Sequence, residues 1–329
     1  MTAFIQPEVW LRFVEDEYLS SYVRSGGSSS KFAVAFDPHS AQSIRAGLSE
    51  VGGRLGYVVV RISASDTRIH KMDEIFFRTA EQLPWKDLSC QVIRELAIHA
   101  GYTWPDRDAA DCDAPLSERI ASKNKVDPQM LLLDLKKQIA NRVFKERKLA
   151  KDFRVAMTHL CLAELAGGSD GALTVRLLTD WLTGRNKTVG AVKPFQIFRK
   201  INRATARYFF ESMVHWVRLA GRPGVLLLMD TERLMLLRDP QDRGLYYTKA
   251  AVLDAYEVLR EFIDGADRVS GYFLVVLPSV AFLEDHSRGL SAYEALKFRV
   301  FDEVRDKRLV NPMGSLVRIA SGQGRERAD

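Results

Sequence analysis

The stretch KFAVAFDPHSAQSIRAGLSEV, residues 31–51, decides the fold. Its first part, residues 31–36 (KFAVAF), is a short apolar run that predicts a buried strand. A polar turn is expected at residues 37–40, and residues 41–51 have the apolar spacing of a helix. The stretch therefore predicts a strand, a turn and a helix, the unit from which parallel sheets are built.

The same alternation continues on both sides of this stretch. Apolar residues recur at helical spacing in residues 10–22, residues 56–62 (GYVVVRI) predict a second buried strand, and residues 72–83 predict an amphipathic helix. This order indicates a parallel sheet with right-handed crossovers, in which ligands bind at the carboxyl ends of the strands.

A long region without strand character follows, from about residue 88 to residue 221. Its helical patterns are interrupted at residues 105–113 and at the Gly/Ser patch of residues 167–171. Within it, Asp127 and Pro128 are typical of a helix N-cap and first helical residue. We therefore expect a large helical insertion.

Strand character returns after the insertion. Three runs predict strands, at residues 225–230 (VLLLMD), 271–277 (GYFLVVL) and 316–319 (LVRI). Two helical patterns lie between them, at residues 248–264 and 293–308. The predicted fold is thus an α/β core with a five-stranded parallel sheet, interrupted by helices.

The predicted division has three parts. Residues 1–87 hold the N-terminal helix and the first half of the core, residues 88–221 the helical insertion, and residues 222–329 the second half of the core.

The composition indicates an ordinary globular protein. Apolar residues make up 47% and charged residues 27%, and the formal net charge is +6. The longest apolar runs are far shorter than the roughly 18 residues that span a bilayer, so we expect a cytoplasmic protein without membrane contact. Neither the three widely spaced cysteines nor the six histidines have metal-ligand spacing, so no metal site is predicted.

The turn after the first strand has the context of a phosphate-binding loop but not its residues. Such a loop uses glycines to curl backbone N–H groups around a phosphate, a Lys to neutralise charge and a Ser or Thr to hold Mg²⁺. Laying GxxxxGK[ST] on residues 35–42 puts Ala35 and Ser40 at the glycines, Ala41 at the Lys and Gln42 at the hydroxyl residue. The pattern alone favours an ordinary strand–turn–helix.

Two further residues of this turn oppose phosphate binding. Asp37 adds a carboxylate where the triphosphate charge would lie, and Pro38 removes a backbone donor. The nearest cations, His39 and Arg45, do not have the position of the missing Lys.

The strand at residues 225–230 favours the nucleotide-binding interpretation because it ends in Asp230, as strands that orient Mg²⁺ and water do. A structural role for Asp230, such as capping the next turn, fits the sequence equally well. Thr231 stands where an active enzyme offers a Glu, and Glu232 comes one residue late, which argues against hydrolysis.

Basic residues are interleaved with aromatic residues between Asp180 and Glu211, with no acid among them. The mixture can follow a phosphate backbone and stack on bases, but a solvated helix face or a contact with an acidic subunit gives the same pattern. The candidate contact residues for nucleic acid or a partner are Arg185, Lys187, Lys193, Arg199, Lys200, Arg203 and Arg207, interleaved with Phe195, Phe198, Tyr208 and Phe209.

Several stretches together resemble the ATP-binding P-loop proteins (BrxD-like) of bacteriophage-exclusion (BREX) defence operons. They include FVEDEYLSSYVRSGGSSSKFAVAF, INRATARYFFESMVHWVRLAGRPGVLLLMD and YYTKAAVLDAYEVLREFID. The resemblance implies an AAA+-like P-loop core, with Asp230 as the Walker B acid and Ser279 near a sensor position. It also implies Arg288 or Arg299 as candidate trans-acting arginines. The chain departs from the family pattern at the phosphate loop, where working members carry GKT/S-type residues.

The first functional hypothesis is a degenerate ATPase subunit, not active by itself, that acts as scaffold or regulator beside an active paralogue in an anti-phage or DNA-processing complex. It needs no cofactor, although ATP and Mg²⁺ would be the ligands if the loop still binds. The alternatives are a nucleic-acid-binding protein on a structural P-loop scaffold, which would contact DNA, and a divergent ATPase activated by a partner.

Overall fold

The computed structural model describes residues 4–105, 114–186, 188–237, 244–301 and 311–321. The chain divides into two compact units. The sheet unit comprises residues 1–79 and 222–329, and the helical unit comprises residues 80–221. The first division therefore falls earlier in the chain than residue 88, within helix α3 (Met72–Glu81).

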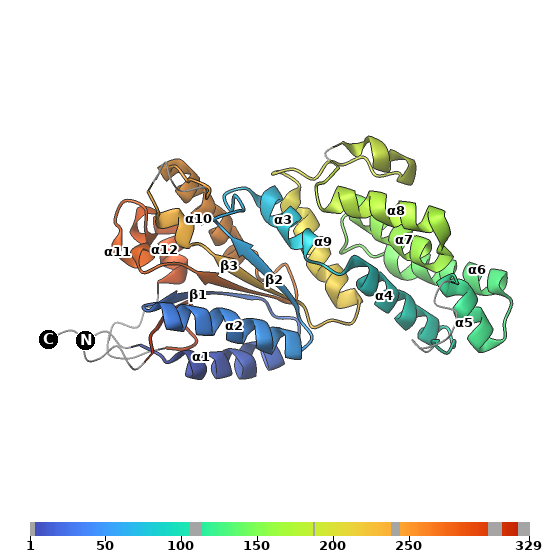
Figure 1. The fold of residues 1–329 in the computed structure, drawn as a ribbon, viewed down its shortest axis with the longest axis horizontal. Helices are drawn as coiled ribbons and strands as arrows, with labels where there is room; N and C mark the ends of the chain where they lie inside the picture. The colour runs from blue at the N-terminus through green and yellow to red at the C-terminus, as the bar shows by residue number, and fades with distance from the viewer. Residues whose placement is uncertain (1–3, 106–113, 187, 238–243, 302–310, 322–329) are drawn as a thin grey trace. The chain divides into compact units, whose positions relative to one another are not determined.

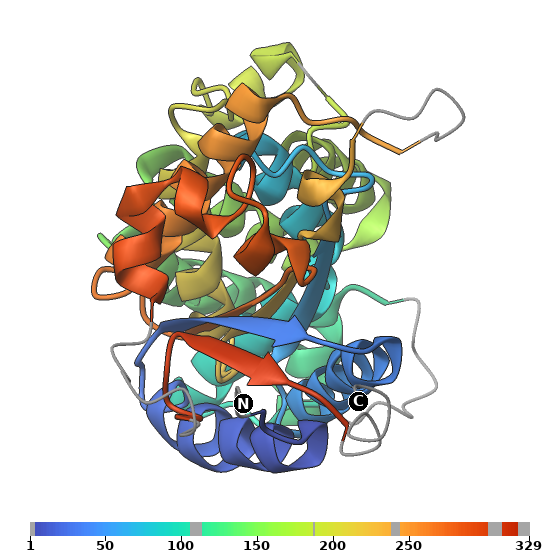
Figure 2. The ribbon, with the colours of Figure 1, turned by 90° about the vertical axis from the view of Figure 1, so that its left-hand side faces the viewer.

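The sheet unit contains five parallel strands in the order β2-β3-β4-β1-β5, which confirms the predicted α/β class (Figure 1). The strands are β1 (Ser29–Ala35), β2 (Val58–Ser63), β3 (Val225–Asp230), β4 (Tyr272–Leu277) and β5 (Leu316–Ile319). Figure 2 shows β1 and β5 side by side and running in the same direction. Connections leave the neighbouring strands β1 and β4 toward opposite edges, so the carboxyl ends of these strands mark the switch point where such sheets bind ligands.

Helices cover both faces of this sheet because its central strands are apolar on both sides. The face that includes Ala33 packs against α1 (Pro7–Phe13), the π-helical segment η1 (Val14–Tyr22) and α2 (Pro38–Arg54), as Figure 1 shows. Phe32 points to the opposite face, where its ring stacks on Phe282 at 5.8 Å between centroids. The second face carries α10 (Lys249–Asp264), α11 (Ala281–Glu284) and α12 (Glu294–Val300), as Figure 1 shows. The short 3-10 helices η4 (Glu232–Met235) and η5 (Leu290–Ala292) contact α11.

The helical unit has no strand among its described residues, as the sequence predicts. Asp127 caps α6 (Pro128–Ile139) by accepting hydrogen bonds from the backbone N–H groups of Gln129 and Met130, both at 2.9 Å. Gly167, at φ +61°, separates α7 (Lys151–Ala166) from α8 (Gly168–Leu182), whose first residue Gly168 has φ +68°. Its elements are α4 (Trp85–His99), α5 (Leu116–Asn124), α6 (Pro128–Ile139), η2 (Ala140–Phe144), α7 (Lys151–Ala166), α8 (Gly168–Leu182), η3 (Val189–Phe195) and α9 (Ala206–Leu219).

Two predicted boundaries are wrong. The turn expected at residues 37–40 does not form, because α2 begins at Pro38 with Asp37 as its N-cap. The helix expected at residues 293–308 ends at Val300, since Phe301 has the extended backbone angles φ −66° and ψ 122°. The remainder of that prediction, residues 302–308, lies outside the described residues. None of the described helices is both long and apolar enough to cross a membrane.

Candidate functional site

The junction between β1 and α2 occupies the place of a phosphate-binding loop. Strand β1 ends at Ala35 and α2 starts at Pro38, so only Phe36 and Asp37 connect them. The residues aligned with the second glycine, the Lys and the hydroxyl of the loop are Ser40, Ala41 and Gln42, and all three lie inside the first turns of α2. A two-residue junction has no loop whose backbone N–H groups can surround a phosphate.

Asp37 is the N-cap of α2, and its carboxylate accepts a hydrogen bond from a backbone N–H at the start of the helix. It accepts hydrogen bonds from the backbone N–H of Ser40 at 2.8 Å, from Oγ of Ser40 at 2.7 Å and from the backbone N–H of Ser321 at 3.0 Å. Although partial burial opposes it, these donors lower the pKa of Asp37. Pro38, His39 and Gln42 are exposed around it. The anion that a helix N-terminus favours is therefore part of the chain.

Asp230 lies at the carboxyl end of β3, beside Ser63 of β2 and Leu277 of β4. One carboxylate oxygen accepts a hydrogen bond from the backbone N–H of Glu232 at 3.0 Å. Burial raises the pKa of Asp230, and the Glu232 amide and the Arg45 guanidinium counteract part of this rise.

Arg45, from the third turn of α2, pairs with both acids of this edge. Its Nη2 lies 2.9 Å from Oδ2 of Asp230 and 2.8 Å from Oε1 of Glu232. The guanidinium thus stands where carboxylates of a Walker B strand would face a metal ion. Among the described residues, no group of three or more His, Cys, Asp and Glu side chains is placed to hold a metal.

A cavity of about 240 Å³ opens at this edge of the sheet, lined by charged groups and by the ends of β2, β3 and β4. Its volume is below the range of about 300–1,000 Å³ that holds most small-molecule ligands. Its lining residues are Arg45, Arg61, Ile62, Ser63, Asp66, Arg78, Leu228, Asp230 and Leu277.

The sensor-like residue Ser279 follows the end of β4. Its hydroxyl oxygen is buried and has no hydrogen-bond partner within the described part of the chain. It therefore makes no hydrogen bond with Asp230 or Glu232.

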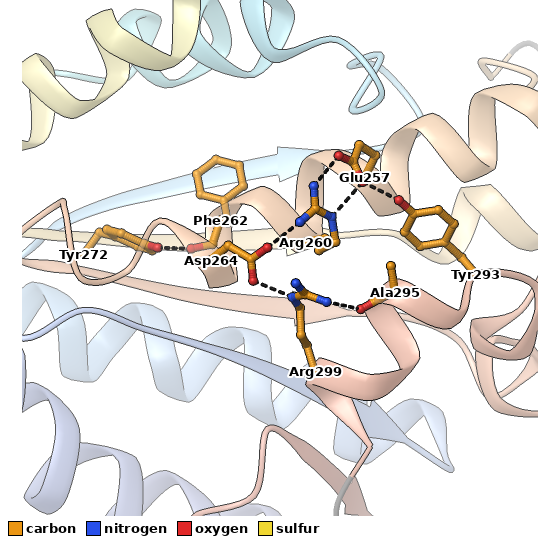
Figure 3. A network of polar contacts seen from close by, with 8 residues as sticks. All are labelled: Glu257, Arg260, Phe262, Asp264, Tyr272, Tyr293, Ala295 and Arg299. Carbon is orange, nitrogen blue, oxygen red and sulfur yellow. Dashed lines mark hydrogen bonds and ion pairs between the residues drawn. The ribbon is translucent and has the colours of Figure 1, made fainter.

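The two candidate trans-acting arginines are engaged inside the sheet unit. Arg288 is only 6% exposed, and its guanidinium donates to the carbonyl oxygens of Leu234 (2.8 Å) and Tyr247 (2.7 Å). Arg299 pairs with Asp264 and donates to the carbonyl oxygen of Ala295 at 2.8 Å (Figure 3). A role in a neighbouring subunit would require these bonds to break.

Figure 3 shows that Arg299 belongs to a network that joins α10 to α12. Arg260 pairs with Glu257 and with Asp264, and the Tyr293 hydroxyl donates to Glu257. The Arg260 guanidinium lowers the pKa of Glu257 to about 2. The network pairs Glu257, Arg260, Asp264 and Arg299 with one another inside the sheet unit.

The candidate contact residues for nucleic acid or a partner belong to the helical unit, and the structure describes six of the seven. Arg185, Lys193, Arg199, Lys200 and Arg203 are exposed. Arg207 is half-buried and lies 3.7 Å from Glu211, and Lys187 lies outside the described residues. Of the interleaved aromatics, Phe198 and Tyr208 are exposed at 65% and 61%, whereas Phe209 is buried.

Two interactions of the site were not predicted from the sequence. The pairing of Arg45 with Asp230 and Glu232 joins residues far apart in the chain, and the donor from Ser321 comes from beyond β5. The cap at Asp37 had a local signal, because Asp37-Pro38 has the same form as Asp127-Pro128.

ATP with Mg²⁺ does not fit these residues. Asp37 brings negative charge to the start of α2, Pro38 has no N–H to donate, and Arg45 occupies the oxygens of Asp230 and Glu232 that would face Mg²⁺. No catalytic step through the nucleotide follows from this arrangement.

The sheet order and the acid at the end of β3 define an α/β protein with a P-loop NTPase-like core. The chain belongs to the family of BREX system ATP-binding proteins BrxC/D. The model of this family matches residues 115–323, well over half of the chain. Membership implies a role in phage defence and a place in a multi-subunit defence complex. The matched range includes Asp230 but not the junction at residues 35–42. No curated protein and no solved structure was found to match the chain.

Proposed function

We propose that the chain is a degenerate ATPase subunit that acts as a scaffold or regulator in a phage-defence complex. The observation that carries the proposal is that charged side chains of the chain pair with one another where a nucleotide site would hold its ligands. Asp37 caps α2 where a phosphate would bind, and Arg45 pairs with the acids that would face a metal ion.

At the start of α2, both the charge and the reduced number of free backbone N–H donors oppose the binding of a triphosphate. A helix N-terminus attracts anions because its first N–H groups are unsatisfied and its dipole is positive there. In this chain the Asp37 carboxylate accepts the N–H of Ser40, and Pro38 contributes no N–H. A triphosphate would have to displace a carboxylate that is tied to Ser40 and Ser321, or lie against its charge.

The acids that would face a metal ion are also paired, in this case with Arg45. Mg²⁺ in nucleotide sites is held by one or two carboxylates together with the phosphates. Here the Arg45 guanidinium bonds to Asp230 and Glu232 at once, at 2.9 and 2.8 Å. Metal binding would require the arginine to leave both acids.

Isothermal titration of the full chain with ATP–Mg²⁺, together with a phosphate-release assay, tests the proposal. We expect no binding at micromolar ATP and no turnover, and no change in either readout for Asp230→Ala. Asp267→Ala, which removes an exposed acid of the same unit, is the matched control. Micromolar binding with turnover that Asp230→Ala abolishes and Asp267→Ala preserves would contradict the proposal.

A second candidate function is a divergent ATPase that a partner activates. The family's description as ATP-binding favours it. In this case a partner would have to draw Arg45 away from Asp230 and supply the missing cation.

The two candidates differ when another subunit from the same BREX locus is added. If ATPase activity of the mixture is unchanged by Asp230→Ala in this chain, the activity belongs to the partner, and the scaffold role is supported. Activity that requires both proteins and is lost in Asp230→Ala would favour the partner-activated enzyme. Co-purification of the two proteins checks the proposed heteromeric complex.

A further inference from the structure

The positive charge of the protein is concentrated in one segment. The helical unit contains 23 Lys and Arg against 16 Asp and Glu, a net charge of +7, whereas the sheet unit contains 25 against 26, a net charge of −1. Residues 181–210, the basic segment, contain seven of the basic residues and no acid. The remainder of the helical unit therefore has 16 of each sign and is neutral.

The central part of the basic segment is held in a defined conformation. The side chains of Ile197 and Ile201 are buried, at 0% and 4% exposure, on either side of three exposed residues, Phe198, Arg199 and Lys200. The buried carboxylate of Asp152 accepts the backbone N–H groups of Phe198 at 2.8 Å and Arg199 at 3.1 Å. The exposed side chains are thus presented by a backbone that is already ordered.

Further bonds fix the remainder of this turn up to the start of α9. The Thr205 hydroxyl donates to the carbonyl oxygen of Lys200 at 2.9 Å, and Oδ1 of Asn202 accepts the backbone N–H of Ala204 at 3.1 Å. A surface that is ordered before binding loses less entropy when a ligand arrives. The geometry therefore favours a binding surface over a solvated tail.

The exposed side chains have the two properties that a single strand of nucleic acid requires. Lys193, Arg199 and Lys200 supply positive charge for phosphates, and Phe198 and Tyr208 supply exposed rings. Because Phe198 is 65% exposed between the buried Ile197 and Ile201, most of its ring lies outside the core of the unit. Aromatic rings beside basic groups stack on unpaired bases, which a duplex keeps inside its helix.

We propose that the basic segment of the helical unit binds single-stranded nucleic acid, with Lys193, Arg199 and Lys200 on the phosphates and Phe198 stacked on a base. This function goes beyond the proposed scaffold role and does not depend on it, because the segment lies outside the nucleotide site. If the nucleic-acid-binding proposal fails, the scaffold proposal is unaffected, and the reverse also holds, because ATP titration and nucleic-acid binding are measured separately.

Fluorescence anisotropy of the full chain with a labelled 20-nucleotide DNA strand of mixed sequence tests the proposal. Affinity should fall as salt rises, and the triple variant Lys193→Ala, Arg199→Ala, Lys200→Ala should reduce the slope of log affinity against log salt by about 2. The affinity itself should fall about tenfold or more at moderate salt. Phe198→Ala should weaken binding about tenfold, because loss of one stacked ring has about that effect. The same strand as a duplex should bind more weakly, and an RNA strand of the same sequence shows whether the sugar matters.

The matched control is the triple variant Lys136→Ala, Lys137→Ala, Arg147→Ala, which removes three exposed charges elsewhere in the helical unit. It should change affinity by less than about twofold, and circular dichroism should show that all variants fold. The proposal is overturned if the control loses as much affinity as the basic-segment variant, or if the basic-segment variant binds like the wild type. Tighter binding of the duplex, with no effect of Phe198→Ala, would overturn the assignment to a single strand.

Discussion

Two helices of this protein begin with the same dipeptide, Asp-Pro, but the residues that precede it differ. Asp127-Pro128 starts α6 in the helical unit, and Asp37-Pro38 starts α2 in the sheet unit. In both, the Asp carboxylate accepts backbone N–H groups and Pro is the first helical residue. Only Asp37 lies after a central parallel strand, the position at which such folds bind phosphate. The same cap therefore brings a carboxylate to that position in the sheet unit, whereas in the helical unit it only starts a helix.

Among the substitutions that test this comparison, Asp37→Ala is expected to lower the free energy of unfolding most. Loss of a helix N-cap costs about 0.5–2 kcal/mol, and Asp37 stands at the upper end because it also binds Oγ of Ser40 and the N–H of Ser321. We expect a loss of about 2 kcal/mol for Asp37→Ala and about 1 kcal/mol for Asp127→Ala in urea unfolding.

Hydrogen exchange measured by mass spectrometry assigns these losses to their helices. Asp37→Ala should increase exchange in α2 and Asp127→Ala in α6. A larger loss for Asp127→Ala than for Asp37→Ala would break the comparison.

The second prediction concerns pH. The folded-state pKa of Asp37 is lowered from about 3.8, so its contribution to stability is complete above that value and is lost as pH falls through the folded pKa. The stability difference between wild type and Asp37→Ala should therefore shrink between pH 7 and pH 3. Asp37→Asn keeps an acceptor without the titration, so its stability relative to Asp37→Ala should not change over this range. An unchanged difference between wild type and Asp37→Ala would contradict the charge-based cap.

A smaller effect is expected from Arg45→Ala. The Arg45 side chain is 37% exposed and Asp230 31%, so solvent weakens their attraction, and we expect a cost of about 1 kcal/mol. A double-mutant cycle with Asp230→Ala should give a coupling of similar size. Arg54→Ala on the same helix should cost about 0.5 kcal/mol or less, because the Arg54 side chain is 56% exposed and its ion pair is with Glu15, a single acid, whereas Arg45 pairs with two. Equal costs for both arginines would show that Arg45 has no special tie to Asp230.

The smallest effect is expected from the prolines. Pro38→Ala and Pro128→Ala should each cost about 0.5 kcal/mol, because the first N–H of a helix has no partner in the helix and the proline acts mainly by restricting the unfolded chain. Equal urea midpoints for the two variants would support the comparison. A much greater cost for Pro38→Ala would show that the junction has a requirement that α6 lacks.

Much of the fold was predictable because its signals are local. The strands at residues 225–230 and 316–319 and the cap at Asp127 come directly from apolar runs and cap residues. The start of α2 was not predicted because Asp37-Pro38 follows a strand, where its polar sequence fits a loop as well as a helix cap. The end of α12 was missed because the helical pattern continues past Val300 while the backbone becomes extended at Phe301.

The site was predictable only in part. The acid at the end of β3 follows from the sequence, but its pairing with Arg45 depends on the strand order, which no local pattern contains. Likewise, the mixture of basic and aromatic residues at 181–210 was evident, whereas the exposure of Phe198 and the burial of Phe209 are set by packing.

The order of the strands along the chain has a consequence for synthesis. Strand β2 pairs with β3, so Val58 meets Val225 only after the whole helical unit has been made. The helical unit is continuous in sequence and can form its contacts as it leaves the ribosome, but β1 and β2 must wait with their apolar edges unpaired. We expect chaperone dependence and protease sensitivity during translation to concentrate on residues 29–63, to fall when β3 and β4 emerge, and to end when β5 pairs with the second edge of β1.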